Sequence, residues 1–397
     1  MRDAVIVEAV RTPVGKAKRG GAYLDVHPVD LHAHALRSLV ARVPGLDPGD
    51  VDDVIGGVVG QVGEQSTNST RLAAIAAGFP ESVPGVTVDR QCGSSQQALS
   101  FAAQGLVAGA YDIVIASGVE SMSRVPIGSA AVVNGVRTDF TGPAVAARYP
   151  GGLIPQGVSA ELIARKWGLS RTQLDEYAAT SHHRAAAAWR QGRFAAQVAP
   201  LPGVDLAMDE TIRPGTTVAR LAELPASFAA DHWTARFGEI DWRVTAGNSS
   251  PLNDGSAALL LTTSDTARRR GWRPRARIHT ATVVGDDPIY MLTGIIPATA
   301  KVLARAGLTM DDIDAFEVNE AFSSVVLAWL AETGADPIRV NVDGGAIAIG
   351  HPLGASGARL ATTLLHVLER TGGRYGLQTM CEAGGTANAT VIERLDA

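Results

Sequence analysis

The sequence predicts a layered α/β fold built from two similar halves, with a segment of different character inserted between them. Apolar runs typical of buried strands alternate with amphipathic helical runs near both ends of the chain. The order of these runs repeats at a nearly constant spacing, and the repeat is interrupted in the middle. The 397 residues, 46% of them apolar, suffice for roughly two to three domains with large cores.

The first 120 residues alternate between strand and helix. Short apolar runs indicate the strands, three- and four-residue spacing of apolar residues indicates the helices, and Pro or Gly ends most of them. Because such alternation is typical of crossover connections, we expect a largely parallel sheet. The expected elements are a strand at 4–7, a helix at 29–43, a strand at 51–59, a helix at 70–77, a strand at 86–88, a helix that begins after Ser95 and ends at Gly109, and a strand at 113–116.

The last third of the chain repeats this plan. Leu46 and Leu308 precede equivalent predicted strands and are 262 positions apart. Cys92 and His351 each lie at a strand-to-helix junction and are 259 positions apart. Independent segments would rarely keep so constant a spacing, so the sequence predicts two copies of one unit.

The middle of the chain follows another pattern. Ser170 to Gln173 has the form of a capping box, and the Ala-rich helix that it begins ends near Gly192. We interpret this part as a loop domain that lies over the sheet. The expected division is an N-terminal half at 1–119 with part of 244–270, a loop domain at 120–243 and a C-terminal half at 271–397.

Two adjacent histidines, His182 and His183, lie in the Ala-rich helix. Neighbouring helical residues point about 100° apart, so the pair cannot share a metal ion. We therefore interpret both as part of the solvated face of the helix.

The charge and hydropathy of the chain exclude several classes of function. The formal net charge of -5 gives no basic field of the kind that nucleic-acid binders carry. Asp3 and Glu8 interrupt the apolar stretch near the N-terminus, and no run approaches the roughly 18 to 20 apolar residues that span a bilayer. We expect a cytoplasmic protein that binds neither nucleic acid nor membrane.

Cys92 is the first candidate for chemistry. It lies just before an amphipathic helix and is followed by Gly93 and two serines. The free N–H groups and the dipole of a helix N-terminus favour a thiolate over a thiol. The alternative is a small buried apolar residue. We expect a nucleophile whose own backbone N–H serves as an oxyanion donor.

His351 and Cys381 are further candidates. His351 lies in the Gly-rich segment 341–357, which is either a tight turn or a rigid support for a base that activates a nearby thiol. Cys381 opens a second run of small residues. A redox pair usually has close spacing such as CxxC, which is absent, so we favour an acid/base role for Cys381.

Seven segments, in this order, resemble those of the thiolase family of acetyl-CoA acyltransferases. They are VIVEAVRTPVG at 5–15, DRQCGSS around Cys92, GVESMSRVP at 118–126, VTAGNSSPLNDG at 244–255, VNEAF at 318–322, GGAIAIGHPLGASG at 344–357 and the segment that begins at Cys381. The resemblance extends over essentially the whole chain. It implies the αβαβα fold of two similar halves with a loop domain, and a homodimer or homotetramer.

The resemblance also implies roles for matched residues. Cys92 matches the nucleophile that takes the acyl group as a thioester. His351 matches the base that deprotonates it and then, with a water held by Asn319, donates to the thioester oxygen. Cys381 matches the second acid/base, which protonates the departing acetyl-CoA enolate in degradation or removes an α-proton of acetyl-CoA in synthesis.

Other positions match family residues that bind coenzyme A, which is a substrate. The resemblance implies no metal and no redox cofactor. Arg213 and Ser250 match positions near the nucleotide and the pantetheine, although Arg213 has the alternative of a solvated surface charge. Positions that match the tunnel lining are Ala246, Met291 and Phe322.

The chain departs from the family pattern at three places. Ala383 replaces a glycine whose backbone N–H helps to form an oxyanion hole, and any positive φ there would be strained. A histidine of some biosynthetic members is replaced within 153–157, and the loop at 229–242 is longer. These departures favour a degradative 3-ketoacyl-CoA thiolase over an acetoacetyl-CoA maker.

Two other functions are alternatives. A ketoacyl synthase uses one cysteine and usually two histidines, and Cys381 and the Asn319 segment argue against it. A catalytically silent acyl-CoA-binding homologue is supported only by Ala383.

Overall fold

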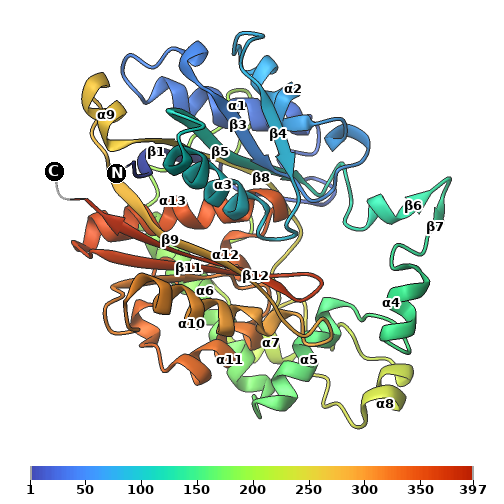
Figure 1. The fold of residues 1–397 in the computed structure, drawn as a ribbon. Coiled ribbons are helices and arrows are strands. Elements are labelled where there is room, and N and C mark those ends of the chain that lie inside the picture. Colours follow the sequence, from blue (N-terminus) through green and yellow to red (C-terminus); the bar gives the residue numbers. More distant parts are fainter. Residues whose placement is uncertain (1, 396–397) are drawn as a thin grey trace.

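The computed structural model describes residues 2–395, whose strands meet in a ten-stranded mixed sheet (Figure 1). The strand order is β10-β11-β12-β9-β1-β8-β5-β3-β4, and β2 pairs with β8. The strands are β1 (Val5–Arg11), β2 (Gly15–Lys16), β3 (Asp53–Gly57), β4 (Gly85–Val88), β5 (Ile113–Ser121), β8 (Asn253–Thr262), β9 (Ala276–Gly285), β10 (Ala315–Val318), β11 (Tyr375–Glu382) and β12 (Thr386–Arg394).

The sheet consists of two copies of one strand pattern. In the first copy, β4, β3 and β5 are parallel, and β8 and β1 follow antiparallel. In the second copy, a bridge at Val340, β10 and β11 are parallel, and β12 and β9 follow antiparallel. The copies join through only a short pairing of β1 with β9 at Val5 and Ile6. The predicted duplicated α/β fold is confirmed.

The expectation of a largely parallel sheet is wrong. The strands β8 and β12 each run antiparallel to both of their main neighbours. The β11–β12 connection is a tight turn at residues 383–385, which reverses the chain without a crossover helix. The predicted alternation of strand and helix is therefore correct for the early strands of each copy, but not for the last strand.

Helices form three layers around the two strand sets. The outer layers are α1 and α2 on the first copy and α10 and α11 on the second, and α3 and α13 lie between the strand sets (Figure 1). These helices are α1 (Pro28–Ala41), α2 (Ser69–Ala76), α3 (Ser94–Ala108), α10 (Ile295–Ala306), α11 (Ser323–Thr333) and α13 (Leu353–Thr371), with α9 (Ser264–Arg270) and α12 (Ala346–Ile349) beside them. None of the helices within 2–395 is long and apolar enough to cross a membrane.

Local signals in the sequence correctly predicted where several helices begin or end. The helix α3 ends at Gly109, which takes the left-handed conformation with φ of 81°. The capping box at Ser170 is present, with the Ser170 side chain accepting from Gln173 N and the Gln173 side chain accepting from Ser170 N. Short side chains that satisfy free helix N–H groups make such ends readable from sequence alone.

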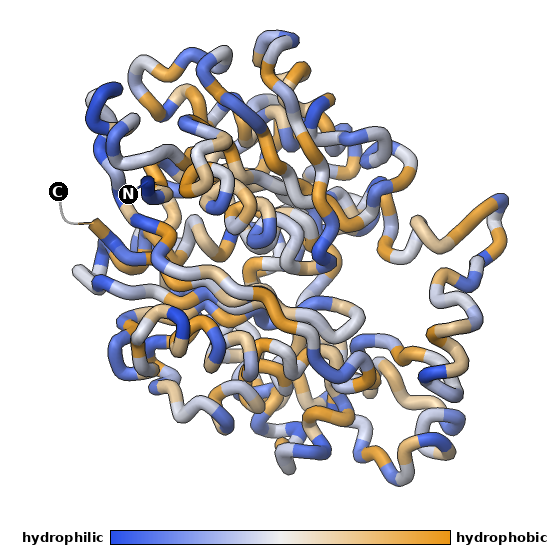
Figure 2. Tube along the Cα trace, viewed as in Figure 1, coloured by the Kyte–Doolittle hydropathy of each residue, from blue (hydrophilic) through white to orange (hydrophobic). Residues whose placement is uncertain are grey.

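The segment between β5 and β8 contains the hairpin β6 (Val132–Val133) and β7 (Val136–Arg137), followed by α4 (Gly142–Arg148), α5 (Gln156–Lys166), α6 (Arg171–Arg190), α7 (Val218–Ala222) and α8 (Asp231–Phe237). Both α5 and α6 pack against helices of the second copy, α11 and α12. The β6–β7 hairpin and α4 extend from the body as an arm, with apolar residues near the tip (Figures 1 and 2). The boundaries 120 and 243 stay a prediction.

The interpretation of both histidines of α6 as solvated is wrong for His182. His183 is exposed, whereas His182 is buried and its Nδ1 accepts a hydrogen bond from Arg213 N at 3.2 Å. Burial and the nearby Arg213 charge lower the pKa of His182 to about 4. The same 100° rotation that separates the two side chains turns one of them into the protein.

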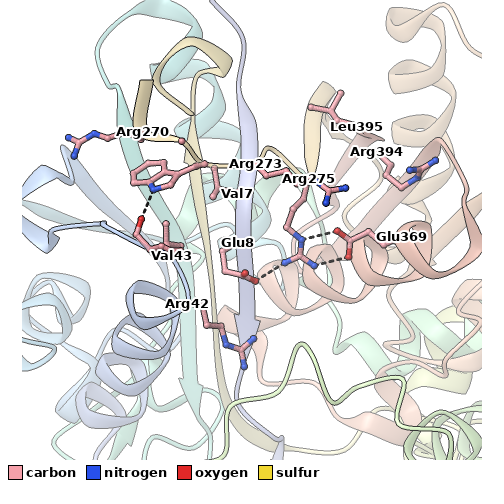
Figure 3. Close-up of a pocket in the computed structure, with 13 residues that line it drawn as sticks. Val7, Glu8, Arg42, Val43, Arg270, Arg273, Arg275, Glu369, Arg394 and Leu395 are labelled. Carbon is pink, nitrogen blue, oxygen red and sulfur yellow. Dashed lines mark hydrogen bonds and ion pairs between the residues drawn. The ribbon is translucent and has the colours of Figure 1, made fainter. Parts of the chain in front are cut away.

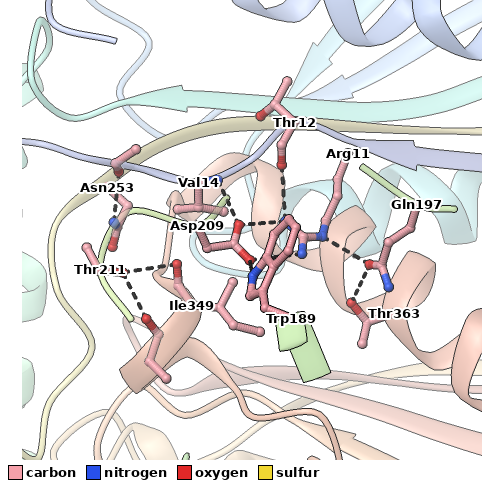
Figure 4. A network of polar contacts seen from close by, with 12 residues as sticks. Arg11, Thr12, Val14, Trp189, Gln197, Asp209, Thr211, Asn253, Ile349 and Thr363 are labelled. Atoms are coloured by element: carbon pink, nitrogen blue, oxygen red, sulfur yellow. Dashed lines mark hydrogen bonds and ion pairs between the residues drawn. The ribbon is translucent and has the colours of Figure 1, made fainter. Parts of the chain in front are cut away.

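A buried ion pair fastens the inserted segment to the sheet (Figure 4). Both terminal nitrogens of Arg11 on β1 contact the carboxylate of Asp209, at 2.7 and 3.0 Å. Trp189 of α6 donates to the same carboxylate, and Arg11 Nε donates to Gln197, which also accepts from Thr363 of α13. Strand β1, helix α6 and helix α13 are thereby held in one arrangement.

The two copies meet backbone against backbone where α13 packs on α3 and β3. A Cβ added to Gly357 would lie 2.2 Å from Gln96 N, and one added to Gly354 would lie 2.6 Å from Gly57 O. Ser95 Oγ accepts from Ala358 N at 2.9 Å, which closes the same contact. Only glycine permits this approach.

Replacing Gly357 by alanine is expected to destabilise the protein. Alanine would add about 1 kcal/mol of helix propensity, but the clash with Gln96 N should outweigh it and lower the free energy of unfolding by about 2–4 kcal/mol. Chemical denaturation measures the difference. The matched control is Gly285→Ala, where a Cβ meets nothing within 4 Å. Equal stability of the two variants would contradict the proposed packing constraint.

Candidate active site

A tight turn holds Cys92 two residues before the start of α3. Gln91 has a positive φ of 50°, and Gly93 N donates to Arg90 O at 3.1 Å. Ser94 Oγ donates to Gln91 O at 2.6 Å and accepts from Arg90 N at 2.9 Å. Such a turn fixes the backbone around the thiol, and the positive φ of Gln91 is a sparsely populated conformation that the surrounding hydrogen bonds maintain.

The Cys92 side chain is buried, and this corrects the expectation of a thiolate. Cys92 packs in an apolar cluster with Leu360 and Met380. Burial raises the pKa of the Cys92 thiol, and the neighbouring Cys381 and Glu382 raise it further, against a hydrogen bond from the Gln156 side chain that lowers it. Loss of hydration therefore outweighs the helix N-terminus. Cys92 needs a base to become a nucleophile.

His351 is arranged as such a base. Its Nδ1 lies 2.6 Å from Ser356 Oγ, and Ser356 Oγ donates to Pro352 O at 2.9 Å. Because the single hydroxyl hydrogen is used by Pro352, Ser356 accepts from His351 Nδ1–H. The Nε2 atom is then unprotonated. Burial and the Arg359 charge lower the pKa of His351 to about 3, so the ring is neutral.

Asn319 lies between His351 and Cys381. Its Nδ2 is 3.5 Å from His351 Nε2, and its side chain hydrogen-bonds the Cys381 thiol. Its Oδ1 is buried and has no hydrogen-bond partner within residues 2–395. A buried amide oxygen of this kind is a ready acceptor for a further donor.

Cys381 lies near the end of β11 and is fully buried. Burial and the adjacent Glu382 raise its pKa to about 12, while the Asn319 hydrogen bond acts in the opposite direction. Cys92 and Cys381 lie close enough to interact electrostatically. The structure thus brings the predicted residues together, with Asn319 contacting both His351 and Cys381. Such a group of neutral thiols and one neutral imidazole can exchange protons with a bound substrate.

The expected strain at Ala383 does not arise. The turn between β11 and β12 places its positive φ values at Gly384 and Gly385, at 84° and 77°. Ala383 is not among the residues of 2–395 that have a positive φ. Its backbone N–H is unaffected by the methyl group.

The residues matched to coenzyme A divide into two groups. Met291 and Phe322 are buried in the same apolar cluster as Cys381. Ser250 is half-buried, and its N–H donates to Ala321 O at 2.9 Å, which sets it beside Phe322. Ala246 and Arg213 are exposed. The structure therefore places Met291 and Phe322 in the apolar core that also contains Cys381 and leaves Arg213 at the surface.

Sequence reasoning missed three residues that contact the site: Ser356, Gln156 and Glu382. Ser356 could have been found, because it lies only five residues after His351, in the first turn of the helix that follows. Glu382 directly follows Cys381, but its burial cannot be read from a linear sequence. Gln156 reaches Cys92 from the N-terminus of α5, far along the chain.

Two cavities lie outside this group of residues. A cavity of about 660 Å³ beside the middle of β1 and the C-terminal end of α13 is lined by five arginines, of which Arg275 pairs with Glu8 and Glu369 (Figure 3). None of the predicted site residues lines it. A second cavity, of about 470 Å³, is bordered by the Gly384–Gly385 turn and by Arg148, Tyr149 and Leu153. It adjoins the turn that contains Ala383.

Comparison with known proteins gives a consistent result. The thiolase N-terminal domain matches residues 4–265, and the thiolase C-terminal domain matches residues 272–394. A steroid 3-ketoacyl-CoA thiolase of Mycobacterium tuberculosis is 49% identical over 401 residues, which cover 100% of this chain and 95% of that protein. A 3-ketoacyl-CoA thiolase of Aeromonas hydrophila is 44% identical, with 100% of both chains covered.

A solved structure also supports the thiolase fold. The crystal structure of the Bacillus anthracis acetyl-CoA acetyltransferase superposes with a TM-score of 0.88 at 36% identity, and covers 100% of this chain and 99% of that one. The expected layered fold with duplicated halves is confirmed at this level too.

Replacing Ser356 by alanine is expected to weaken the base. Without its acceptor, the His351 proton is free to move to Nε2, and Cys92 alkylation by iodoacetamide at pH 7.5 should slow by roughly tenfold. Mass spectrometry of the Cys92 peptide measures the rate. The control is Ser100→Ala, whose buried hydroxyl bonds only within α3. An unchanged alkylation rate in the Ser356 variant would show that the hydrogen bond does not set the tautomer.

Proposed function

The chain belongs to the thiolase family, and on this premise we propose that it cleaves 3-ketoacyl-CoA with CoA into acetyl-CoA and a shortened acyl-CoA. It is an acyltransferase. The observation that carries the proposal is the grouping of two thiols, a neutral imidazole and an amide around one buried point.

The first step joins the substrate to Cys92. The Cys92 sulfur attacks the C3 carbonyl carbon while its proton passes to Nε2 of His351. Because the thiol is poorly acidic and the imidazole is poorly basic, the pair stays neutral until the substrate makes the transfer favourable. The backbone N–H groups of Cys92 and Ala383 donate to the oxyanion that forms at C3.

The second step breaks the bond between C2 and C3. Its electron pair passes to the acetyl-CoA fragment as an enolate, and Cys381 protonates C2. Protonated His351 and a water bound to Asn319 donate to the thioester oxygen of the enolate, and the unpartnered Asn319 Oδ1 supports a water there. The high pKa of Cys381 keeps it a proton donor at neutral pH.

The third step releases the product. The CoA sulfur attacks the acyl group on Cys92 and gives its proton to the Cys381 thiolate. His351 returns its proton to the departing Cys92 sulfur. The enzyme then regains its starting state, and neither a metal nor a redox cofactor takes part.

Substrate contacts follow from the same proposal. Met291 and Phe322, which share an apolar core with Cys381, line the acyl tunnel. Arg213, Ser250 and Ala246 contact coenzyme A, for which the exposed guanidinium of Arg213 suits a phosphate. Both thiols must stay reduced, which favours the cytoplasm.

The names of the relatives favour degradation. Proteins at 43% to 49% identity are 3-ketoacyl-CoA thiolases, whereas the solved acetyl-CoA acetyltransferase is 36% identical. The synthetic direction, which joins two acetyl-CoA molecules, uses the same residues in reverse and is the second candidate.

Substitutions of the two cysteines are expected to block different steps of the reaction. Cys92→Ala should lose thiolysis of every 3-ketoacyl-CoA, because no acyl-enzyme forms. Cys381→Ala should lower thiolysis by roughly 10²- to 10⁴-fold. It should still form a thioester on Cys92 when incubated with acetyl-CoA, since that transfer makes no carbanion.

Loss of 3-ketoacyl-CoA absorbance over short, medium, long and ring-bearing chains measures the first effect, and intact-protein mass spectrometry measures the second. Acylation of the Cys92 variant would contradict the assignment of the nucleophile. A folded wild-type protein that consumes no 3-ketoacyl-CoA would favour the catalytically silent alternative.

We also propose that the chain forms at least a homodimer through β4. This strand is the edge of the sheet, and its Val86 is 40% exposed. Apolar side chains of α2 and α3 flank it: Leu72, Ile75, Phe101 and Val107. An open edge beside an apolar surface is normally covered, and a second copy supplies a matching edge. The exposed apolar arm, with Val133, Val136 and Phe140, offers a further contact for a tetramer.

Replacing Val86 by aspartate is expected to give monomers, because it places a charge at the centre of this surface. Light scattering after size-exclusion chromatography measures the mass. Val133→Asp on the arm is the matched control and should leave a dimer. A Val86 variant with the wild-type mass would show that β4 is not the interface.

A further inference from the structure

Glu382 is a buried carboxyl group that the proposed reaction does not use. It is the last residue of β11, directly follows Cys381 and is fully buried. Its Oε2 accepts a hydrogen bond from Thr386 Oγ1 at 2.7 Å. Its Oε1 has no hydrogen-bond partner within the described part of the chain. A buried carboxyl oxygen without a hydrogen bond lowers the stability of the fold, so its presence requires an explanation.

The unpartnered oxygen faces the segment of the other cysteine. A Cβ added to Gly93 would lie 1.9 Å from Glu382 Oε1. The residue after Cys92 and the residue after Cys381 are therefore in direct contact. No side chain larger than that of glycine fits at position 93 while Glu382 keeps its place.

We propose that Glu382 is a positioning residue that joins the two cysteine segments and that its charge state controls the reactivity of both thiols. When neutral, it only fills the space between them. When ionised, it places a negative charge beside the sulfur atoms and opposes thiolate formation.

The charged groups around Glu382 set the pH at which it ionises. Burial raises the pKa of Glu382 to about 8, and Asp89 of the neighbouring loop also acts to raise it. The Thr386 hydrogen bond and the charge of Arg90 act to lower it. Glu382 in turn raises the pKa of Cys92 and that of Cys381. Glu382 is thus neutral at neutral pH and becomes an anion above about pH 8.

The inference deepens the proposed function, because it takes Cys92 as the nucleophile. Its test uses alkylation of Cys92, which requires no turnover. A protein that fails as a thiolase would therefore still report on Glu382, and the two failures are distinguishable.

The experiment compares the pH profile of Cys92 alkylation by iodoacetamide between pH 6.5 and 9.5. Glu382→Gln keeps the size of the side chain and removes its charge. We expect equal rates in wild type and variant at pH 6.5, and a rate at pH 9 that is roughly three- to tenfold higher in the variant.

Two further variants make the outcome decisive. Thr386→Val removes the hydrogen bond that favours the ionised form, so the flattening of the wild-type profile should move to higher pH. Glu317→Gln is the matched control, because Glu317 is equally buried and has a pKa raised to about 8, but faces Arg359 and not a cysteine. Its profile should follow that of the wild type.

The inference is overturned if the Glu382→Gln profile superimposes on the wild-type profile, or if the Glu317 control shows the same increase. If the Glu382 variant does not fold, the inference is overturned by a Thr386→Val protein whose pH profile of Cys92 alkylation matches that of the wild type.

Discussion

The direct packing of α3 against α13 is the constraint on which the site depends. Where Gly357 meets Gln96, no side chain separates the two helices, so their N-terminal ends come together at the boundary between the strand sets. Cys92 lies two residues before α3, and His351 lies two residues before α13. The positions of Cys92 and His351 are therefore fixed by backbone contacts, which leave little freedom for movement. The Arg11–Asp209 ion pair and the Gly354 N–H bond to Glu120 hold the same region from the side of the sheet.

Burial gives the site its electrostatic character. The pKa values of Cys92 and Cys381 are raised, that of Glu382 is raised and that of His351 is lowered, so each group is driven toward its uncharged form. A neutral centre costs less than a buried ion pair. It also makes the few donors aimed at a developing oxyanion more effective, because little water screens them. Charge then arises only while substrate is being converted.

Much of the fold could be predicted from local signals. The capping box at Ser170, the end of α3 at Gly109 and the constant spacing between the copies are properties of short segments or of their order. Strand direction, the burial of His182 and the neutral state of Cys92 were not predicted, because each depends on contacts between segments distant in sequence. The same holds for Glu382, whose place against Gly93 joins residues almost three hundred positions apart. Cys92, His351 and Cys381 were candidates from their local sequence, whereas Asn319 and the coenzyme A positions came only from the family resemblance; the roles of all of them stay proposals.

The equivalence of the two strand sets has a consequence for the origin of the site. In a symmetric pair of separate, identical chains, the positions before the two central helices would carry the same residue. Covalent fusion of the copies removes that requirement, since each position is then encoded independently. One copy now supplies a thiol at this place and the other an imidazole. Different side chains at these two equivalent positions thus break the symmetry of a scaffold whose halves still match.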